Sequence, residues 1–312
     1  MTRDPFKLTG PTCLSFSGGS TSGYMLWRTL QANTPEDIGR WLIVCFANTG
    51  REAEQTLVFV RECAQRWAIA IVWLEWRDSE EGFARVDFDT ASRDGEPFEA
   101  LIRKRNYLPN PVTRFCTSEL KIRTMHRYLR TLGWHDMEDG WDQFIGIRAD
   151  EPVRVSKIRA RGRSTESSKE TMCMPLAEEG VSYQKVDAFW AQQPFKLELV
   201  RYNGRTLEGN CDYCFLKPPA QRLSLARAEP APRPRLTWWA RIERDAVKTI
   251  APRMVESGFL DERGEPLLVE ARGDGAIFCK DGPTYSQIAV YADRQDEMFD
   301  HDQEALACYC GD

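Results

Sequence analysis

Short apolar runs alternate with segments of helical spacing through the first half of the 312-residue chain. Strands are predicted at residues 12–16, 41–46, 69–74 and 143–147, and a helix over 53–67, where apolar residues recur at helical spacing. Alternating strands and helices are typical of a parallel sheet with helices packed on it. The pattern predicts an α/β fold, a doubly wound parallel sheet of the Rossmann-like kind, with its ligand site beyond the carboxyl ends of the strands.

The sequence changes character near residue 150. Residues 153–169 carry six Lys or Arg against one Glu without apolar periodicity, which predicts a mobile basic loop. Helices are predicted over 182–192 and 236–257, and Trp238 and Trp239 in the latter are predicted to be core residues. No recognisable motif follows residue 217, so we expect one domain over residues 1–217 and a mostly helical extension over 218–312.

The composition excludes several classes of protein. With 42% hydrophobic and 29% charged residues the chain can bury a core, and a net charge of -5 gives no overall basic field for nucleic acid. Neither a signal sequence nor a long apolar segment is evident, so a cytoplasmic protein without a membrane span is expected. In a reducing compartment, ten cysteines favour metal or redox chemistry over disulfides. Only three histidines are present, and their spacing disfavours a histidine zinc site or a Ser-His-Asp triad.

A glycine and serine loop directly follows the first predicted strand and precedes a helix. It consists of Ser17, Gly18, Gly19, Ser20, Thr21 and Ser22. Glycines let the main chain approach an oxyanion, while the hydroxyls and the amides of a helix N-terminus donate to it. The spacing matches neither the Walker loop nor GxGxxG, so the loop is either a phosphate cradle of another type or a turn capped by serines.

This loop resembles the PP-loop, SGGxxS, of the adenine nucleotide alpha-hydrolase superfamily, and four further segments resemble motifs of its phosphoadenosine phosphosulfate (PAPS) reductases in the expected order. Those segments are Ala47 to Glu52 (DTG-like), Arg114 to Lys121 (CxxxxK-like), Gly146 to Arg154 (GxRxDxxxxR-like) and Gly209 to Cys214 (GCxxC-like). The resemblance covers roughly residues 12–217, and five ordered segments are more specific than any one of them.

The resemblance implies an adenine nucleotide, ATP or PAPS, on Ser17 to Ser22, with further contacts from Asn48, Thr49, Gly50, Arg148 and Arg154. It implies that Lys121 and Arg148 face the phosphates or sulfate and assist the reaction. Thr21 stands where ATP pyrophosphatases usually have Asp, which counts against a metal held there. The complete SGG, which PAPS reductases usually lack, favours a triphosphate. Asp150 and Glu151 could hold Mg2+ or orient Arg148.

Three cysteines fall in the segments that carry the resemblance. Cys211 and Cys214 form a CxxC, a spacing at which two thiolates reach one ion, and Cys116 begins a predicted helix. We expect them to hold a [4Fe-4S] cluster, with zinc or no metal as alternatives, and with Cys308 or an open position as the fourth ligand. Cys116 is also a candidate catalytic residue, and Cys310 resembles the C-terminal catalytic cysteine of PAPS reductases. Cys13 and Cys45 lie in predicted strands and Cys63 lies near the buried face of a predicted helix, so these three are expected to be core residues.

Together these features predict a PAPS-reductase-like enzyme of sulfur metabolism. It would transfer sulfur or reduce a sulfonucleotide, with a sulfur donor or thiol reductant as its second partner. A nucleic acid could be the sulfur acceptor, and the chain could form a homo-oligomer. The alternative is a non-catalytic nucleotide- or nucleic-acid-binding module with a structural zinc. Thr21 in place of Asp and the basic segment favour this module.

Overall fold

The computed structural model describes residues 4–161, 164, 166–202, 205–209, 211–250, 254–260, 266–270, 277–279 and 282–293. The chain divides into two compact units, the first built from residues 1–98 and 117–212 and the second from 99–116 and 213–307. The predicted functional boundary after residue 217 stays a prediction.

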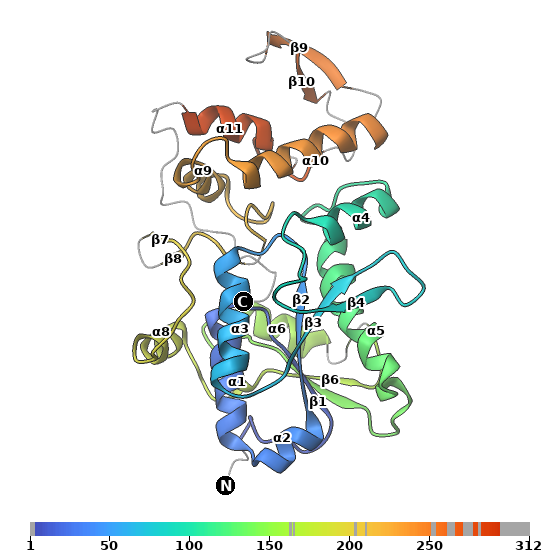
Figure 1. Cartoon of the computed structure of the whole chain (residues 1–312), viewed down its shortest axis with the longest axis vertical. Coiled ribbons are helices and arrows are strands. Elements are labelled where there is room, and N and C mark those ends of the chain that lie inside the picture. Colours follow the sequence, from blue (N-terminus) through green and yellow to red (C-terminus); the bar gives the residue numbers. More distant parts are fainter. Residues whose placement is uncertain are drawn as a thin grey trace. The chain divides into compact units, whose positions relative to one another are not determined.

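A six-stranded sheet forms the centre of the first unit (Figure 1). Its strands lie in the order β4 (Phe83–Val86), β3 (Ile71–Trp76), β2 (Leu42–Asn48), β1 (Thr12–Ser15), β5 (Trp141–Phe144) and β6 (Glu170–Cys173). Every neighbouring pair is parallel except β3 with β4. The four strands expected from the sequence are confirmed, although β5 lies slightly earlier in the chain than predicted, and β4 and β6 were not predicted.

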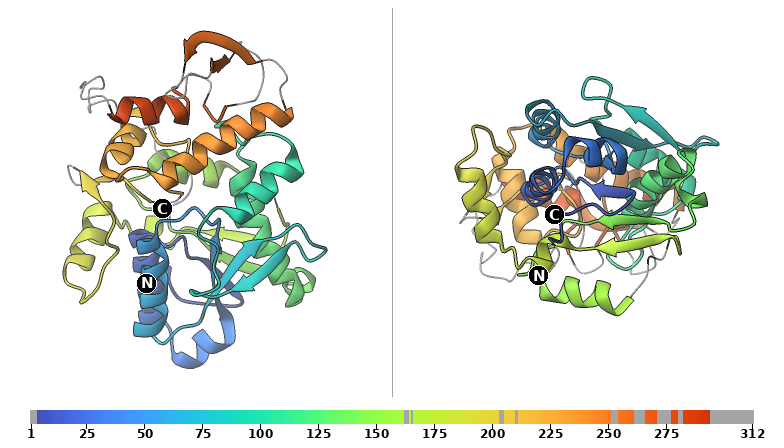
Figure 2. Two further views of the ribbon diagram at one scale, coloured as in Figure 1. Left: turned by 45° about the horizontal axis from the view of Figure 1, so that its top comes forward. Right: turned by 90° about the horizontal axis from the view of Figure 1, so that it is seen from below.

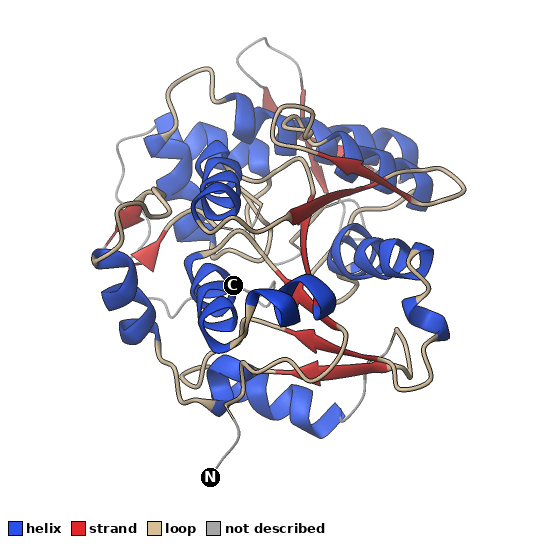
Figure 3. Ribbon diagram, turned by 60° about the horizontal axis from the view of Figure 1, so that its bottom comes forward, coloured by secondary structure: helices blue, strands red, loops and turns tan. Residues whose placement is uncertain are grey.

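Helices cover both faces of this sheet. The helical segments of the first unit are α1 (Ser20–Ala32), α2 (Pro35–Trp41), α3 (Glu54–Arg66), the π-helical η1 (Cys116–Arg123), α5 (Thr124–Thr131), η2 (Trp134–Asp136), α6 (Pro152–Arg161), α7 (Pro175–Glu178) and α8 (Tyr183–Ala191). Helices α1 and α3 pack on one face, and α6 lies on the other (Figures 2 and 3). The predicted α/β fold with a doubly wound, mostly parallel sheet is therefore confirmed.

Side chains of the central strands alternate between the two faces. Leu14 points into the core layer that contains Met25 of α1, whereas its neighbour Cys13 points into the layer that contains Leu129 of α5. Both strand residues are completely buried. A strand buried on both faces reads as a continuous apolar run, which explains why β1 and β2 could be predicted from the sequence.

The strand order reverses at β1. The chain runs from β1 outward through β2 to β3 on one side and resumes with β5 and β6 on the other side. Segments that follow β1 and β5 therefore leave the sheet at adjacent carboxyl ends, which is where doubly wound sheets bind their ligands. The glycine and serine loop, Ser17 to Ser22, and the segment 146–154 both follow strands at this point.

The prediction of a basic loop over residues 153–169 is wrong for most of this range. Residues Pro152–Arg161 form α6. Proline suits the first position of a helix, and Val155 packs against Ile147 and Met174 with Ile158 beside it. Val155 and Ile158, three residues apart, are the apolar residues that hold the helix in place. Two residues are too short a pattern to predict a helix among so many charged residues.

Helices predominate in the second unit. It contains most of α4 (Glu96–Arg105), α9 (Pro219–Ala228), α10 (Pro234–Ile250), α11 (Tyr285–Asp293) and the hairpin of β9 (Met254–Leu260) and β10 (Pro266–Glu270). The short pair β7 (Arg201–Tyr202) and β8 (Arg205–Thr206) belongs to the first unit. The helical extension is confirmed, but the helix predicted to reach residue 257 ends at Ile250, because Pro252 cannot continue it.

An aromatic cluster forms the core of the second unit. The rings of Trp239, Phe278 and Tyr285 lie 5.0 to 5.7 Å apart, and all three are completely buried. Trp238 is also buried, at 7% exposure. The prediction that both tryptophans belong to the core is therefore confirmed.

Candidate functional site

The glycine and serine loop, Ser17 to Ser22, connects β1 to α1. The hydroxyls of Ser17 and Ser22 lie 3.0 Å apart, Ser17 Oγ accepts from Gly19 N at 3.3 Å, and Ser22 Oγ donates to Gly19 O at 2.9 Å. The serine side chains thus fix the main chain of the loop. The N–H groups in the first turn of α1 have no helical partner, so this end of α1 is suited to an anion.

Gly18 holds the loop against α3. Its φ is +79°, in the left-handed region, and an added β-carbon would lie 2.6 Å from Thr56 Cγ2 and 3.2 Å from Phe46 Cε2. The sequence indicated that this glycine lets the main chain approach a ligand. The structure shows a close approach to protein atoms, so any larger residue here would displace the loop.

Arg148, which follows β5, reaches across to the first turn of α1. Its Nη1 donates to Thr21 Oγ1 at 2.9 Å, and its Nε donates to Asp150 Oδ1 at 2.9 Å. Glu151 accepts from Arg148 N at 3.0 Å and forms an ion pair with Arg154. The glycine and serine loop and the segment 146–154 therefore meet where the strand order reverses. Asp150 pairs with Arg148, and Glu151 pairs with both Arg148 and Arg154.

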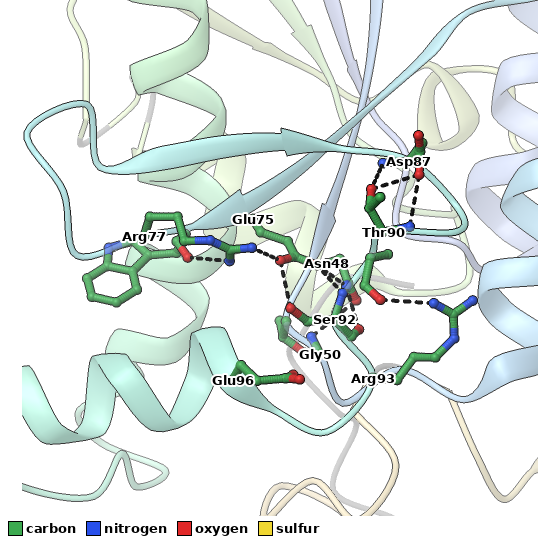
Figure 4. Close-up of polar contacts among 12 residues, drawn as sticks. Asn48, Gly50, Glu75, Arg77, Asp87, Thr90, Ser92, Arg93 and Glu96 are labelled. Carbon is green, nitrogen blue, oxygen red and sulfur yellow. Dashed lines mark hydrogen bonds and ion pairs between the residues drawn. The ribbon is translucent and has the colours of Figure 1, made fainter.

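Asn48, at the end of β2, is engaged by protein groups. Its Nδ2 donates to Glu75 Oε1 at 2.6 Å and to the carbonyl of Ser92 at 2.8 Å, and its Oδ1 accepts from Gly50 N at 3.1 Å. Glu75 also accepts from Ser92 N and Oγ and pairs with Arg77 at 2.6 Å (Figure 4). The amide predicted to bind the nucleotide thus ties the end of β2 to the loop around Ser92.

Three predicted segments meet at Thr49. Its N and Oγ1 both donate to the carboxylate of Glu52, at 2.9 to 3.0 Å. The sulfur of Cys211 lies 3.4 Å from Thr49 Oγ1, and Lys121 Nζ lies 3.8 Å from Glu52 Oε1. The segments after β2, in η1 and around the CxxC motif are therefore brought together within the first unit.

Sequence reasoning missed Glu52 and Glu75 as site residues. The Glu52 side chain is 1% exposed and that of Glu75 is completely buried. Acidic residues are almost never buried unless they are paired. An acidic residue within an apolar run, as in IVWLEW, or directly after a buried strand is the sequence signal that could have found them.

Two further predicted thiols belong to the second unit. Cys116 is the first residue of η1 and is partly exposed, and Cys214 is 4% exposed. Among the residues that the structure describes, no three side chains of His, Cys, Asp or Glu form a group that could hold a metal ion. The cluster therefore stays a prediction. Cys308 and Cys310 lie outside the described residues.

Three cysteines are core residues, as predicted. Cys13, Cys45 and Cys63 are all completely buried. The hydrogen bond with Cys13, together with burial, raises the pKa of Cys45, and burial raises the pKa of Cys63. Because the thiolate is the nucleophile, these two thiols are poor candidates for chemistry.

The described helices include none that is long and apolar enough to cross a membrane. No family model matches the chain. The uncharacterised nin region protein ORF290 of Escherichia phage lambda is 30% identical to it over 224 residues, which cover 68% of each chain. The chain belongs to the ORF290 family.

Two further proteins resemble this member of the ORF290 family. An uncharacterised protein of Methanocaldococcus jannaschii is 25% identical over 170 residues, which cover 54% of the chain but only 29% of the archaeal protein. Among solved structures, the fold is similar to the PAPS reductase of Candida auris in its phosphate complex, with a TM-score of 0.37 and 15% identity over 64% of this chain and 84% of the reductase. A likeness of that size does not bear on the ligand or the activity of the ORF290 family.

Proposed function

We propose that the chain is an enzyme of sulfur metabolism that binds an adenine nucleotide, ATP or PAPS, on the loop Ser17 to Ser22. The observation that carries this proposal is the hydrogen bond from Arg148 to Thr21. It brings a guanidinium to the N-terminus of α1 at the reversal of strand order. Helix amides and a guanidinium both favour phosphate and sulfate oxygens.

Several of the predicted binding residues have a role in this proposal. The amides of the first turn of α1 bind the phosphates, and Arg148 neutralises their charge from the side of β5. Arg154 and Lys121 add positive charge, although in this structure Arg154 pairs with Glu151 and Lys121 pairs with Glu52. Asp150 and Glu151 both pair with Arg148, and in this proposal their oxygens either orient Arg148 or hold a Mg2+ ion that arrives with ATP.

Two reactions are compatible with this site. In the first, an acceptor oxygen attacks the α-phosphorus of ATP, pyrophosphate leaves, and a sulfur nucleophile then displaces AMP from the activated acceptor. In the second, a cysteine thiolate attacks the sulfur of PAPS, and the sulfur–oxygen bond breaks toward the nucleotide phosphate. A second thiol then releases sulfite and leaves a disulfide. Both reactions require the nucleotide phosphates to be held and their charge to be offset.

The cluster on Cys116, Cys211 and Cys214, with Cys308 as a further ligand, remains a separate proposal, with zinc as its alternative. A catalytic role for Cys116 or Cys310 is likewise a proposal. Neither reaction above is routed through a metal centre.

Product analysis on the full chain tests the proposed function. Sulfite formed from PAPS and a thiol reductant would support the second reaction, and AMP with pyrophosphate formed from ATP would support the first. Gly18→Ala should abolish either product because it displaces the loop. Gly133→Ala is the matched control, since Gly133 has a similar φ of +75° and, in the described part of the chain, no atom lies within 4 Å of an added β-carbon. Absence of both products and of nucleotide binding would contradict the proposal.

A second candidate, a nucleic-acid-binding module or an enzyme acting on nucleic acid, is favoured by α6. This helix exposes Lys157, Arg159 and Arg161 directly after the Arg148 segment. Exposed cations can neutralise backbone phosphates, and each such contact weakens binding as salt rises. Binding of labelled RNA and DNA at increasing salt tests this candidate. Replacing the three residues by Glu should then abolish binding, while binding that persists would count against it.

A further inference from the structure

Two of the three histidines of the chain meet within the first unit, beside the first residue of β5. His126 lies on α5 and His135 forms part of η2, and the centroids of their rings are 5.4 Å apart. The ring of Trp141, which begins β5, lies 5.6 Å from that of His126 and 5.0 Å from that of His135. The spacing in the sequence disfavoured a histidine metal site, but the fold brings these two imidazoles together.

Each of the three rings carries a buried polar atom that has no hydrogen-bond partner in the described part of the chain. These atoms are Nδ1 of His126, Nε2 of His135 and Nε1 of Trp141. The side chains of His126 and Trp141 are almost completely enclosed, since the two residues are 5% and 2% exposed. Buried polar groups are nearly always hydrogen-bonded. Three exceptions on neighbouring rings indicate a bound group that the polypeptide itself does not supply.

The other nitrogen of each imidazole is already held by an acceptor. His126 Nε2 lies 3.2 Å from Glu170 Oε1, and the ring of His135 forms a hydrogen bond with the main chain of His126. Because Nε2 of His135 has no partner among the described residues, its Nδ1 makes that bond. A histidine that ligates a metal almost always donates its second N–H to a carboxylate or a main-chain carbonyl, which orients the ring and leaves the other nitrogen for the ion.

The charge of Glu170 favours a cation over a water molecule at this place. Its side chain is 3% exposed, and in the described chain no lysine or arginine pairs with it, only His126. A buried charge requires a compensating one. A proton on His126 Nδ1 would supply it but would leave a buried N–H without an acceptor, whereas a metal ion at Nδ1 supplies the charge and uses the lone pair. Arg130 and Asp136 act on His135 with opposite signs, so together they do not supply it.

We propose that His126 Nδ1 and His135 Nε2 bind a divalent transition-metal ion, zinc or a similar ion that prefers imidazole nitrogen. Glu170 is a positioning residue that orients the ring of His126. The described chain holds no group of three such ligands, so water fills the remaining positions around the ion. The indole N–H of Trp141 can only donate, which suits the oxygen of such a water.

This site goes beyond the proposed function, because it lies at another place in the fold. Trp141 and Glu170 are the first residues of the parallel strands β5 and β6 and are partners in the register of the two strands. The glycine and serine loop, by contrast, follows the carboxyl end of β1, which is parallel to β5. The metal site can therefore be tested without a nucleotide, and its outcome is independent of the sulfur chemistry proposed above.

Zinc titration of the full chain labelled with 15N-histidine tests the site. The protein is first treated with EDTA, and the ring nitrogen signals of its three histidines are assigned by replacing them one at a time. Zn2+ should shift the signals of His126 and His135 together, and EDTA should reverse the shift. Zinc bound by cysteines elsewhere would leave these signals in place. Ring signals of both residues that stay unchanged in excess zinc would overturn the proposal in favour of an ordered water among the three rings.

His135→Gln separates a shared ion from an effect on one ring. His135 is partly exposed, so the substitution should leave the fold intact, and the zinc-free spectrum of the variant checks this. Loss of one of the two protein ligands should abolish the zinc-dependent shift of His126. His301→Gln is the matched control, because it removes the third histidine of the chain and should leave both shifts unchanged. A shift of His126 that persists in His135→Gln would overturn the proposed pairing.

Glu170→Gln tests the positioning role of the carboxylate. The amide keeps an oxygen acceptor beside His126 Nε2 but removes the negative charge. The zinc concentration at which the two ring signals have shifted halfway should rise about 10- to 100-fold, as the loss of an outer-shell partner of a metal ligand typically causes. A purely structural role of Glu170 would change the stability of the protein without this change in zinc affinity, and that result would contradict the role given to its charge.

Discussion

The indole nitrogen of Trp190 donates a hydrogen bond to the main-chain carbonyl of Ser20, 2.8 Å away. This bond joins α8 to the first turn of α1, where the glycine and serine loop ends. The two helices can approach because of Gly23, where an added β-carbon would lie 2.7 Å from Trp190 Cζ2 and 3.0 Å from Phe59 Cζ. The position of the loop therefore depends on packing between segments that are distant in the sequence.

Gly23→Ala should destabilise the protein although alanine is the better helix former. The added methyl group meets two buried rings, and overpacking of this kind costs about 1 to 3 kcal/mol. Gly39→Ala in α2 is the control, because no atom of the described chain lies within 4 Å of its added β-carbon. It should raise the free energy of unfolding by up to about 1 kcal/mol. Urea denaturation measures both; shifts of the same sign would contradict the packing at Gly23.

Arg148→Met should weaken nucleotide binding. The substitution removes a charge-assisted hydrogen-bond donor at the N-terminus of α1, which we expect to raise the Kd for ATP or PAPS about tenfold or more. Arg40→Met is the control for loss of one positive charge, since Arg40 lies on α2 and stacks on Trp41 at 4.5 Å. Isothermal titration calorimetry compares the two variants, and equal effects would argue against a ligand at Arg148.

Glu75→Gln should lower the free energy of unfolding by about 2 to 3 kcal/mol. The carboxylate accepts from Asn48, from Ser92 N and Ser92 Oγ and from Arg77, and an amide group would face one of these donors with its own N–H groups. Glu80→Gln, at an exposed position, should change stability by less than about 0.5 kcal/mol. Denaturant midpoints of the two variants that coincide would disprove the role given to Glu75.

The Arg241 and Glu99 pair makes the stability of the second unit depend on pH. Its hydrogen bonds lower the pKa of Glu99 from the ordinary value of 4.5. A carboxyl whose pKa is lower in the folded state stabilises that state above its unfolded pKa, and the contribution is lost as pH falls through the folded pKa. Because both groups are partly exposed, we expect only about 0.5 to 1 kcal/mol.

Glu99→Gln measures this contribution. The variant should be less stable than the natural chain near neutral pH, and the difference should shrink as the pH falls below about 4. Urea titrations of both proteins at several pH values provide the comparison. A difference that stays constant from neutral pH into the acid range would exclude the ion pair as its cause.

The sequence was informative where neighbouring residues determine structure. The runs around Cys13 and Val44 are buried on both faces of the sheet, so their apolar character predicted β1 and β2 directly. The loop Ser17 to Ser22 was found because its chemistry is contained in six consecutive residues. Helix α6 was missed because Val155 and Ile158 alone mark its buried side.

The contacts of the site could not be predicted because they join distant residues. Thr49 and Cys211 are separated by 162 positions, and Ser20 and Trp190 by 170. The sequence placed Cys211 among metal ligands from its CxxC spacing. It carried no signal of the hydroxyl that lies beside the sulfur in the folded protein.

The separation of Thr49 from Cys211 also orders events while the protein is being made. Synthesis proceeds from the N-terminus, so β1, the glycine loop and Thr49 leave the ribosome well before Cys211 does. By then β6 has also emerged, because it ends at Cys173. A nascent chain can therefore build its whole central sheet before the sulfur of Cys211 reaches Thr49, and a product cut short before residue 211 would retain the glycine and serine loop without that thiol.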